Sequence, residues 1–272
     1  MKLVRLPRSS FYYHLKATSV PDKYALVKKE LKQLYHRHKG RFGYRRLTLA
    51  LKKTGMRINH KTVFRLLKSL GLRSLIRVRK YRSYKGEMGR VAANVLSRNF
   101  QSEKPNQKWA TDVTEFSVRD RKLYLSPIID LFNGEIISYS LSESPNFAQV
   151  THMLEKAFKK VKRAEMKGLI LHSDQGWQYQ MKHYQQLLQA RGIIQSMSRK
   201  GNCLDNAIIE NFFGTIKAEL FYLNNYLSID QLKKDIINYI HYYNHHRIKL
   251  HLKGKSPKEF RQALLRALHS TT

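Results

Sequence analysis

The amino-acid sequence predicts an α/β protein in which a mixed sheet flanked by helices follows a small all-α domain. Leucines recur at helical spacing through residues 24–80, with glycines between the runs. From Lys108 the pattern changes to strand-like runs with a hairpin signal, and then to strands that alternate with helices. With 42% hydrophobic residues among 272, the chain has enough apolar surface for a core, and its length suits one or two domains with linkers.

Changes in composition along the chain indicate five segments. The first is short and basic, the second is helical, and the third carries Gly, Ser, Asn and basic residues without periodicity. The fourth has the α/β pattern and the fifth is a short tail. In this order the boundaries give a basic N-terminal arm over 1–20, a helical domain over 21–80, a basic linker over 81–104, the α/β domain over 105–265 and a tail over 266–272.

Three helices are expected in the all-α domain. The first follows Leu26–Leu34, the second covers Tyr44–Lys53, and Asn59 is placed to cap the third, which Gly71 ends. A helix, a short turn that contains glycine and a second helix are typical of the helix-turn-helix motif. The domain is therefore expected to bind DNA. The alternative is an ordinary three-helix bundle with a solvated basic face.

The charge of the chain supports a nucleic-acid partner. Lys and Arg number 52 against 19 Asp and Glu, so the net charge is +33, which destabilises the fold by self-repulsion unless a polyanion offsets it. Solubility alone needs far less charge. Neutralising phosphates releases condensed counterions, so we expect DNA as the partner. The basic side chains expected to contact it in or beside the helical domain are Arg45, Arg46, Lys61, Arg65, Lys68, Arg77, Arg79 and Lys80.

Cysteine usage and the absence of long apolar runs indicate an intracellular protein. Cys203 is the only cysteine, which excludes a disulfide within the chain and a Cys-rich zinc site. The sequence shows no signal peptide at its start and no apolar stretch near the roughly 20 residues of a membrane span. We therefore expect a cytoplasmic, nucleoid-associated protein with no membrane partner.

The α/β domain begins with strands and ends with helices. Two strands come first, and Asn133-Gly134 then predicts a two-residue hairpin into a third strand from Ile136. Two further strands alternate with helices, two long helices close the chain, and a short helix follows Pro257. The expected strands are 109–118, 122–131, 136–139, 168–172 and 193–197, and the expected helices are 146–161, 182–190, 205–222 and 228–245.

Three carboxylates stand where these elements can bring them together. Asp112 lies within the first strand, Asp174 lies just past the end of a short buried strand, and Glu210 lies near the start of a long helix. Two-metal phosphodiester chemistry needs acidic oxygens that converge from several elements, and Mg²⁺ prefers such oxygens. The alternative of scattered surface charges is weak, because acids are scarce in this chain.

The helix around Glu210 has an apolar stripe that should face the sheet. At about 100° per residue, Asn206, Glu210 and Lys217 cluster on the flank of this stripe. Lys217 lies two turns beyond Glu210, about 10 Å away, which suits a DNA phosphate and is too far for a direct ion pair. We therefore expect Asn206 and Lys217 to contact DNA. The alternative for Lys217 is a solvated lysine.

Other candidate residues have simpler interpretations. His241 and His245 are four apart on a helix, which is a zinc-ligand spacing, but no third soft ligand is evident, so packing or DNA contact is favoured. Asp130 and Asp205 are the rival acids. Asp130 precedes the hairpin, and Asp205 is placed to cap its helix.

Together these motifs resemble the DDE integrase core, and in particular the second-frame (OrfB) transposases of bacterial insertion sequences. The resemblance rests on Trp109-Ala-Thr-Asp112, on His172-Ser-Asp174-Gln-Gly176 and on Asp205-Asn206 followed by Glu210 and Lys217. Thirty-five residues separate Asp174 from Glu210, which is the spacing of that family. Tyr243-Asn244, Arg247 and Ser256-Pro257 match its C-terminal signature, and Arg41-Phe-Gly-Tyr-Arg45-Arg46 matches its helix-turn-helix region.

The resemblance implies an RNase H-like catalytic domain that acts on DNA ends. Its catalytic and metal-binding residues would be Asp112, Asp174 and Glu210, with Mg²⁺ as the cofactor and Mn²⁺ as a substitute, and Arg247 would contact DNA. It implies cleavage and strand transfer between terminal inverted repeats and target DNA, by a homo-oligomer on DNA, with a first-frame (OrfA) protein or frameshift fusion as a partner. The alternatives are a DNA-binding regulator with an inactive core and a plain RNase H-type nuclease.

Overall fold

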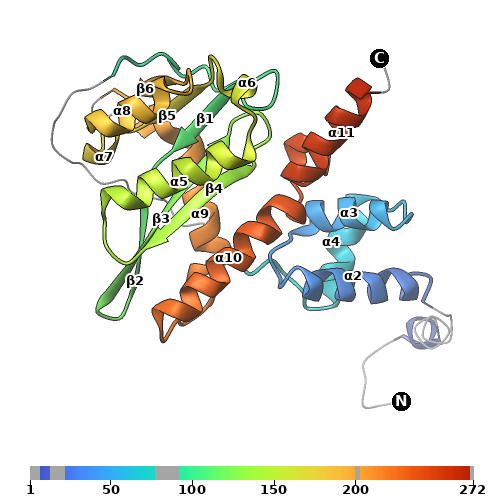
Figure 1. Ribbon diagram of the computed structural model, residues 1–272. Coiled ribbons are helices and arrows are strands. Elements are labelled where there is room, and N and C mark those ends of the chain that lie inside the picture. The colour runs from blue at the N-terminus through green and yellow to red at the C-terminus, as the bar shows by residue number, and fades with distance from the viewer. Residues whose placement is uncertain (1–6, 13–21, 77–91, 200–202, 270–272) are drawn as a thin grey trace. The chain divides into compact units, whose positions relative to one another are not determined.

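The computed structural model describes residues 7–12, 22–76, 92–199 and 203–269 (Figure 1). The chain divides between Leu75 and Ile76 into two compact units, an N-terminal helical unit and a C-terminal α/β unit. Arg77, Arg79 and Lys80, which the sequence suggests as DNA contacts, lie outside the described residues. In the part of the chain that is described, no helix is long and apolar enough to cross a membrane.

The N-terminal unit is the three-helix domain that the sequence predicts. It consists of α2 (Ala25–Arg37), α3 (Tyr44–Lys53) and α4 (His60–Ser69). The Asn59 side chain caps α4 by accepting a hydrogen bond from the backbone N–H of Lys61 at 2.8 Å. The apolar faces of the helices form the core, with Leu31, Leu34, Leu47, Leu51, Val63, Leu66 and Leu67 buried.

The C-terminal unit is built on a six-stranded mixed sheet. Its strands are hydrogen-bonded in the order β2-β3-β1-β5-β6, and β4 pairs with the other edge of β3. β1, β2 and β4 are antiparallel to β3, whereas β1, β5 and β6 are parallel to one another. The strands are β1 (Lys108–Thr111), β2 (Thr114–Val118), β3 (Arg121–Asp130), β4 (Ile136–Ser142), β5 (Ile170–Ser173) and β6 (Ile194–Met197). The predicted mixed sheet is confirmed.

β1 and β2 form one strand that is interrupted only at residues 112 and 113. Trp109 lies opposite Asp130 and Thr114 lies opposite Leu125, so the pairing with β3 continues in the same register across the gap. Pro127 of β3 falls opposite the gap, and a proline has no N–H to donate to a ladder. The single strand predicted over 109–118 is thus broken at Asp112, whose backbone leaves the regular ladder.

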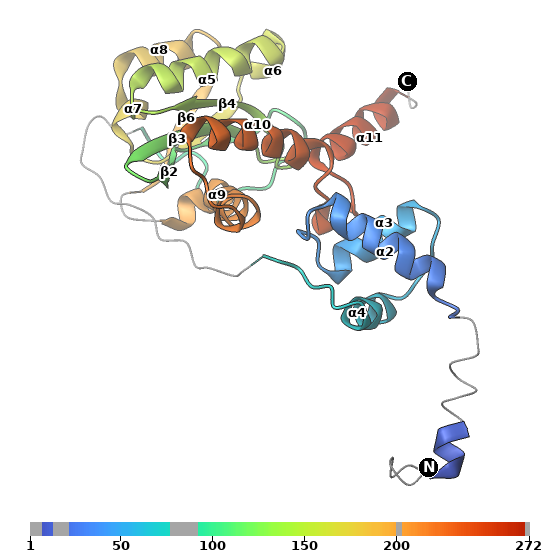
Figure 2. The same cartoon turned by 90° about the horizontal axis from the view of Figure 1, so that it is seen from below.

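Helices cover both faces of the sheet (Figure 2). α5 (Phe147–Lys160) and α8 (Lys182–Gln189) lie on one face, together with two short helices that the sequence pattern does not indicate, α6 (Arg163–Met166) and α7 (Trp177–Gln180). α9 (Ala207–Glu219) and α10 (Ile229–His245) lie on the other face. Each face has its own apolar cluster, one around Trp109 and Met153 and the other around Phe213 and Ile236. Three-layer packing of this kind fixes the strand ends at which the carboxylates stand.

The β3–β4 connection and the C-terminal helix differ from expectation. Five residues, 131–135, separate the two strands, where a two-residue turn was predicted, although Gly134 does adopt a positive φ of 68°. α11 (Pro257–His269) is a helix of 13 residues, where a short one was predicted. Arg261 of α11 pairs with Asp130 and Glu135 on either side of the turn, so the helix is tied to this connection.

Part of the predicted linker belongs to the α/β unit. The backbone N–H of Leu96 donates to Ser196 Oγ at 3.1 Å, and the N–H of Met197 donates to the carbonyl of Ala93 at 3.3 Å. Lys108 Nζ donates to the carbonyls of Asn99 and Gln101 at 2.8 and 2.7 Å. The described part of the predicted linker, residues 92–104, is therefore folded against the sheet.

Candidate active site

Asp112 occupies the break between β1 and β2. Its Oδ1 accepts a hydrogen bond from the N–H of Val113 at 2.7 Å, and its Oδ2 accepts one from Asn206 Nδ2 at 3.2 Å. Burial raises the pKa of Asp112 well above its usual range, and the negative charge of Asp174 raises it further. A carboxylate in this position gains from any cation that binds nearby.

Asp174 follows the last residue of β5. Its Oδ1 accepts a hydrogen bond from the N–H of Gly176 at 2.9 Å, and burial raises the pKa of the carboxyl. A Cβ added at Gly176 would lie 2.9 Å from this same oxygen, so a larger residue there would displace the carboxylate from its present position. β1 and β5 are parallel neighbours, and both carboxylates follow the carboxyl ends of their strands. They therefore emerge at the same edge of the sheet.

Glu210 reaches this edge from the first turn of α9. Ile209 and Phe213 on that helix are completely buried against the sheet, which leaves Glu210 half-buried at the flank, as the helical spacing predicts. Burial raises the pKa of Glu210, and the charge of Asp174 raises it further.

The donor set fits a divalent cation. The charges of Asp174 and Glu210 both raise the pKa of Asp112, which is repulsion that a bound cation would relieve. Carboxylate oxygens are hard ligands of the kind that Mg²⁺ takes. Within residues 7–12, 22–76, 92–199 and 203–269, however, no three His, Cys, Asp or Glu side chains lie close enough together for a ready-made metal site. The three carboxylates would have to close around a cation as it binds.

Lys217 lies on α9 near the same carboxylates. Its ammonium is 5.5 Å from the ring centroid of Phe116 on β2. Burial lowers the pKa of Lys217, and the charges of Glu115 and Asp112 raise it in part. The lysine is therefore a half-buried cation beside the site and not a freely solvated one, while its contact with DNA stays a prediction.

Asn206 has a different role from the predicted one. Its side chain is 5% exposed, and its Nδ2 donates to Asp112 Oδ2. A buried amide bound to a site carboxylate is badly placed to contact DNA, so the structure corrects that prediction. Asn206 orients Asp112, a role that its sequence neighbours did not indicate because the two residues are 94 positions apart.

Asp205 joins three segments beside the site. Its carboxylate is buried and accepts hydrogen bonds from the backbone and guanidinium of Arg199, from Arg98 Nε and from Asn94 Nδ2. The hydrogen bonds from Arg199 are the main reason that the pKa of Asp205 is far below its usual value. The predicted helix cap is wrong, because the residue at the N-cap of α9 is Asn206 and no side chain caps that helix. Asp205 instead fastens residues 94–98 to the start of α9.

Two more polar residues belong to the fold and not to the site. Asp130 is buried and accepts hydrogen bonds from the N–H groups of Asn106 and Phe132 and from Arg261, which removes it as a rival catalytic acid. Arg247, predicted to contact DNA, is 7% exposed and pairs with Glu219 through both Nε and Nη2. The structure therefore corrects the prediction of a DNA contact, and Arg247 instead stabilises the fold.

The basic residues of the N-terminal unit are accessible. Lys61, Arg65 and Lys68 are exposed on α4. On α3, Arg45 is exposed and Arg46 is half-buried, with its guanidinium 5.7 Å from the ring centroid of Phe42. Their contact with DNA stays a prediction, now with the exposure that it requires.

The two histidines at zinc-ligand spacing stack on each other. The rings of His241 and His245 on α10 are 4.3 Å apart at an interplanar angle of 18°. Burial and the nearby charge of Lys258 lower the pKa of His245. The stacking shows that the two rings pack on each other.

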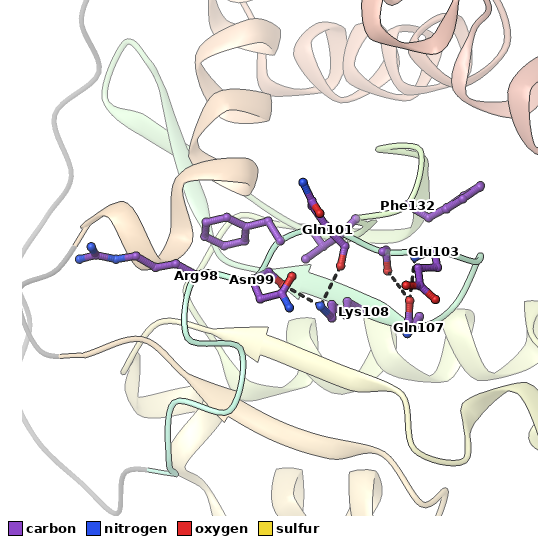
Figure 3. A pocket seen from close by; sticks show the side chains of 10 residues that line it. Arg98, Asn99, Gln101, Glu103, Gln107, Lys108 and Phe132 are labelled. Atoms are coloured by element: carbon purple, nitrogen blue, oxygen red, sulfur yellow. Dashed lines mark hydrogen bonds between the residues drawn. The ribbon is translucent and has the colours of Figure 1, made fainter.

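A pocket of about 730 Å³ lies at the other end of β1 from Asp112 (Figure 3). It is bounded by residues 98–103, by Gln107 and Lys108, and by Leu131 and Phe132 of the β3–β4 connection. Figure 3 shows the Lys108 side chain held between the carbonyls of Asn99 and Gln101. Glu103 is the only acid in its lining, so this pocket is separate from the three carboxylates.

Solved structures that resemble this chain include retroviral integrases. A simian T-cell lymphotropic virus intasome in complex with PP2A regulatory subunit B56 gamma aligns with a TM-score of 0.48 and 17% identity, covering 85% of this chain and 74% of that one. The HTLV-2 integrase catalytic core domain in complex with magnesium aligns with a TM-score of 0.41 and 19% identity, covering 58% of this chain and 98% of that one.

Sequence comparison covers both units. Residues 102–203 and 210–265 each match a family model described as "Integrase core domain", and residues 21–80 match one described as "HTH-like domain". A putative transposase InsK for insertion sequence element IS150 of Escherichia coli K12 is 58% identical over 261 residues, which are 96% of this chain and 92% of that protein. An uncharacterized transposase-like protein of Haemophilus influenzae is 54% identical over 215 residues, which are 79% of this chain and 98% of that protein.

Proposed function

Because this chain belongs to the family of insertion-sequence transposases with an integrase core, we propose that it cuts DNA at the ends of an insertion element and joins them to a target. Membership of this family implies polynucleotidyl transferase activity, and its integrase-like core implies the use of divalent metal ions. The finer proposal is that Asp112, Asp174 and Glu210 are the catalytic residues and the ligands of Mg²⁺, with Mn²⁺ as a substitute. The observation that carries it is the position of Asp112 and Asp174 just past the carboxyl ends of the neighbouring parallel strands β1 and β5, with Glu210 close enough on α9 for its charge to raise the pKa of Asp112.

Bound divalent cations would supply activation of the attacking water or DNA 3′-hydroxyl and stabilisation of the leaving oxygen. The residues of this chain supply position. Asn206 and the N–H of Val113 fix the two oxygens of Asp112, and the N–H of Gly176 fixes one oxygen of Asp174. Lys217 places a positive charge beside the carboxylates, where it would hold a DNA phosphate near the cut.

The partners follow from charge and family. The N-terminal unit presents Lys61, Arg65 and Lys68 on one helix face, which suits the phosphates of duplex DNA at the terminal inverted repeats. Cutting and joining act on two element ends and a target, so the active form would be a homo-oligomer on DNA. A first-frame OrfA protein, separate or fused by frameshifting, would contribute further end recognition.

A labelled duplex from the element end, incubated with Mg²⁺ and target DNA, tests this function. Joined product supports the transposase. Cut product without joining would indicate an RNase H-type nuclease, and a shifted band without any chemistry would indicate a DNA-binding regulator.

A further inference from the structure

The exposed face of α4 combines positive charge with one large aromatic ring. His60, Lys61, Arg65 and Lys68 are exposed on this helix, and its inner face is buried. Phe64 is 56% exposed. It follows Lys61 by three residues and precedes Lys68 by four, so it stands between them on the same face. An apolar ring is thus displayed at the centre of a cationic surface.

The ring of Phe64 is braced from α3. Its centroid is 5.3 Å from that of Tyr44, with an interplanar angle of 65°. Tyr44 also stacks on His60 at 6.1 Å, and its hydroxyl accepts a hydrogen bond from Arg45 Nε at 3.1 Å. The ring is therefore held in place on one side and open on the other. Covering the exposed part of the ring with a partner would remove apolar surface from water, which is favourable.

The charges around Phe64 identify that partner as DNA. Residues 22–76 contain 16 Lys and Arg and only two acids, Asp22 and Glu30, so a polyanion is favoured over a protein surface. The last helix of a helix-turn-helix enters the major groove. The apolar group that this groove displays is the 5-methyl of thymine, for which phenylalanine is a suitable contact.

We propose that Phe64 is a specificity-determining residue that contacts a thymine methyl in the major groove of the element end, while Lys61, Arg65 and Lys68 hold the flanking phosphates and base edges. This inference rests on the proposed function, since it requires that α4 reads the element ends. It assigns recognition of a particular base feature to a side chain without charge or hydrogen-bonding groups.

Replacing thymine by deoxyuridine removes the methyl and keeps the base pairing, so it isolates the proposed contact. The end duplex is made with one thymine at a time replaced, and the affinity of the full chain for each duplex is measured. We expect the parent protein to lose about fourfold in affinity at one or two neighbouring positions, which is the value of one buried methyl-sized group.

Phe64→Ala should bind the unmodified end more weakly and should not distinguish thymine from deoxyuridine at those positions. Phe64→Leu, which keeps an apolar side chain, should retain part of the discrimination. Leu26 is 75% exposed on α2, so Leu26→Ala is the matched control and should discriminate as the parent does. Circular dichroism verifies that each variant is folded, and if Phe64→Ala is not, the comparison of Phe64→Leu with Phe64→Gln decides.

A parent protein insensitive to every deoxyuridine, or a Phe64→Ala variant with the same discrimination as the parent, would overturn the inference. The joining assay on the same duplexes separates this from failure of the proposed function. Normal joining without methyl discrimination removes only the role of Phe64, whereas absence of both end binding and joining removes the proposed function as well.

Discussion

Breaking the buried ion pair between Arg247 and Glu219 should strongly destabilise the α/β unit. The two side chains are 7% and 2% exposed, and the guanidinium donates hydrogen bonds of 2.6, 2.9 and 3.1 Å to the carboxylate. Tyr239 adds a fourth at 2.9 Å. Burial alone would lower the pKa of Arg247, but the hydrogen bonds and charge of Glu219 reverse this and raise it, so the arginine stays charged.

Removing one member leaves a buried charge without its partner, which costs about 3–5 kcal/mol. Arg247→Met and Glu219→Leu should each destabilise the unit by about this amount. The double variant Arg247→Met/Glu219→Leu buries no charge, so it should be destabilised less than either single variant and far less than their sum. Apolar replacement of both partners is often close to neutral.

Urea unfolding followed by tryptophan fluorescence measures this loss in the correct unit, because Trp109 and Trp177 are the two tryptophans of the chain and both lie in the α/β unit. Arg266, exposed on α11, provides the control, and Arg266→Met should stay within about 0.5 kcal/mol of the parent. If Arg247→Met unfolded like the parent and instead lowered DNA affinity with a shallower salt dependence, the structural role would be refuted and the DNA contact restored.

Three further predictions concern charge. Asp205→Asn should lower the free energy of unfolding at neutral pH by about 1–3 kcal/mol. The pKa of Asp205 is depressed in the folded state, so its carboxylate stabilises the fold above the ordinary carboxyl pKa, and this stabilisation is lost in acid. The urea midpoints of parent and variant should therefore converge in acid. A difference that persists in acid would contradict this. Lys217→Ala should reduce the rate of joining roughly 5- to 150-fold and leave the midpoint of the Mg²⁺ titration unchanged. Lys217→Arg should restore part of the joining rate. Unchanged joining in Lys217→Ala would mean that Lys217 does not contact DNA. Affinity for end DNA should fall steeply with salt for a chain of net charge +33, and a log–log slope near zero would exclude phosphate-dominated binding.

Most of the fold could be predicted from local sequence patterns. The helical spacing of leucines located α2, α3 and α4 to within a few residues, and Asn59 marked the start of α4 because its cap is made to the next turn of the same helix. The flank of α9 on which Glu210 lies also follows from periodicity alone. Asp174 could be placed at a strand end because a short buried run precedes it, whereas the sequence pattern put Asp112 inside a longer strand.

Residues with distant partners could not be assigned in this way. Arg247 matched a family signature and is basic, yet its partner Glu219 lies 28 positions earlier, and only the packing of α10 against α9 buries the pair. Asp205 sits where a helix cap is common, but Arg98, 107 positions away, and Arg199 hold it elsewhere. Pro127 interrupts the strand at Asp112 from across the sheet, which neither segment indicates by itself.

Strand transfer by carboxylate variants tests the central claim most directly. Asp112→Asn, Asp174→Asn and Glu210→Gln are compared with Asp120→Asn, an exposed carboxylate in the β2–β3 turn, using labelled end DNA, target DNA and Mg²⁺. The account predicts that the first three variants lose both cleavage and joining while they keep end binding, and that Asp120→Asn acts like the parent. Joining that survives in any one of the three would exclude that residue from the catalytic site.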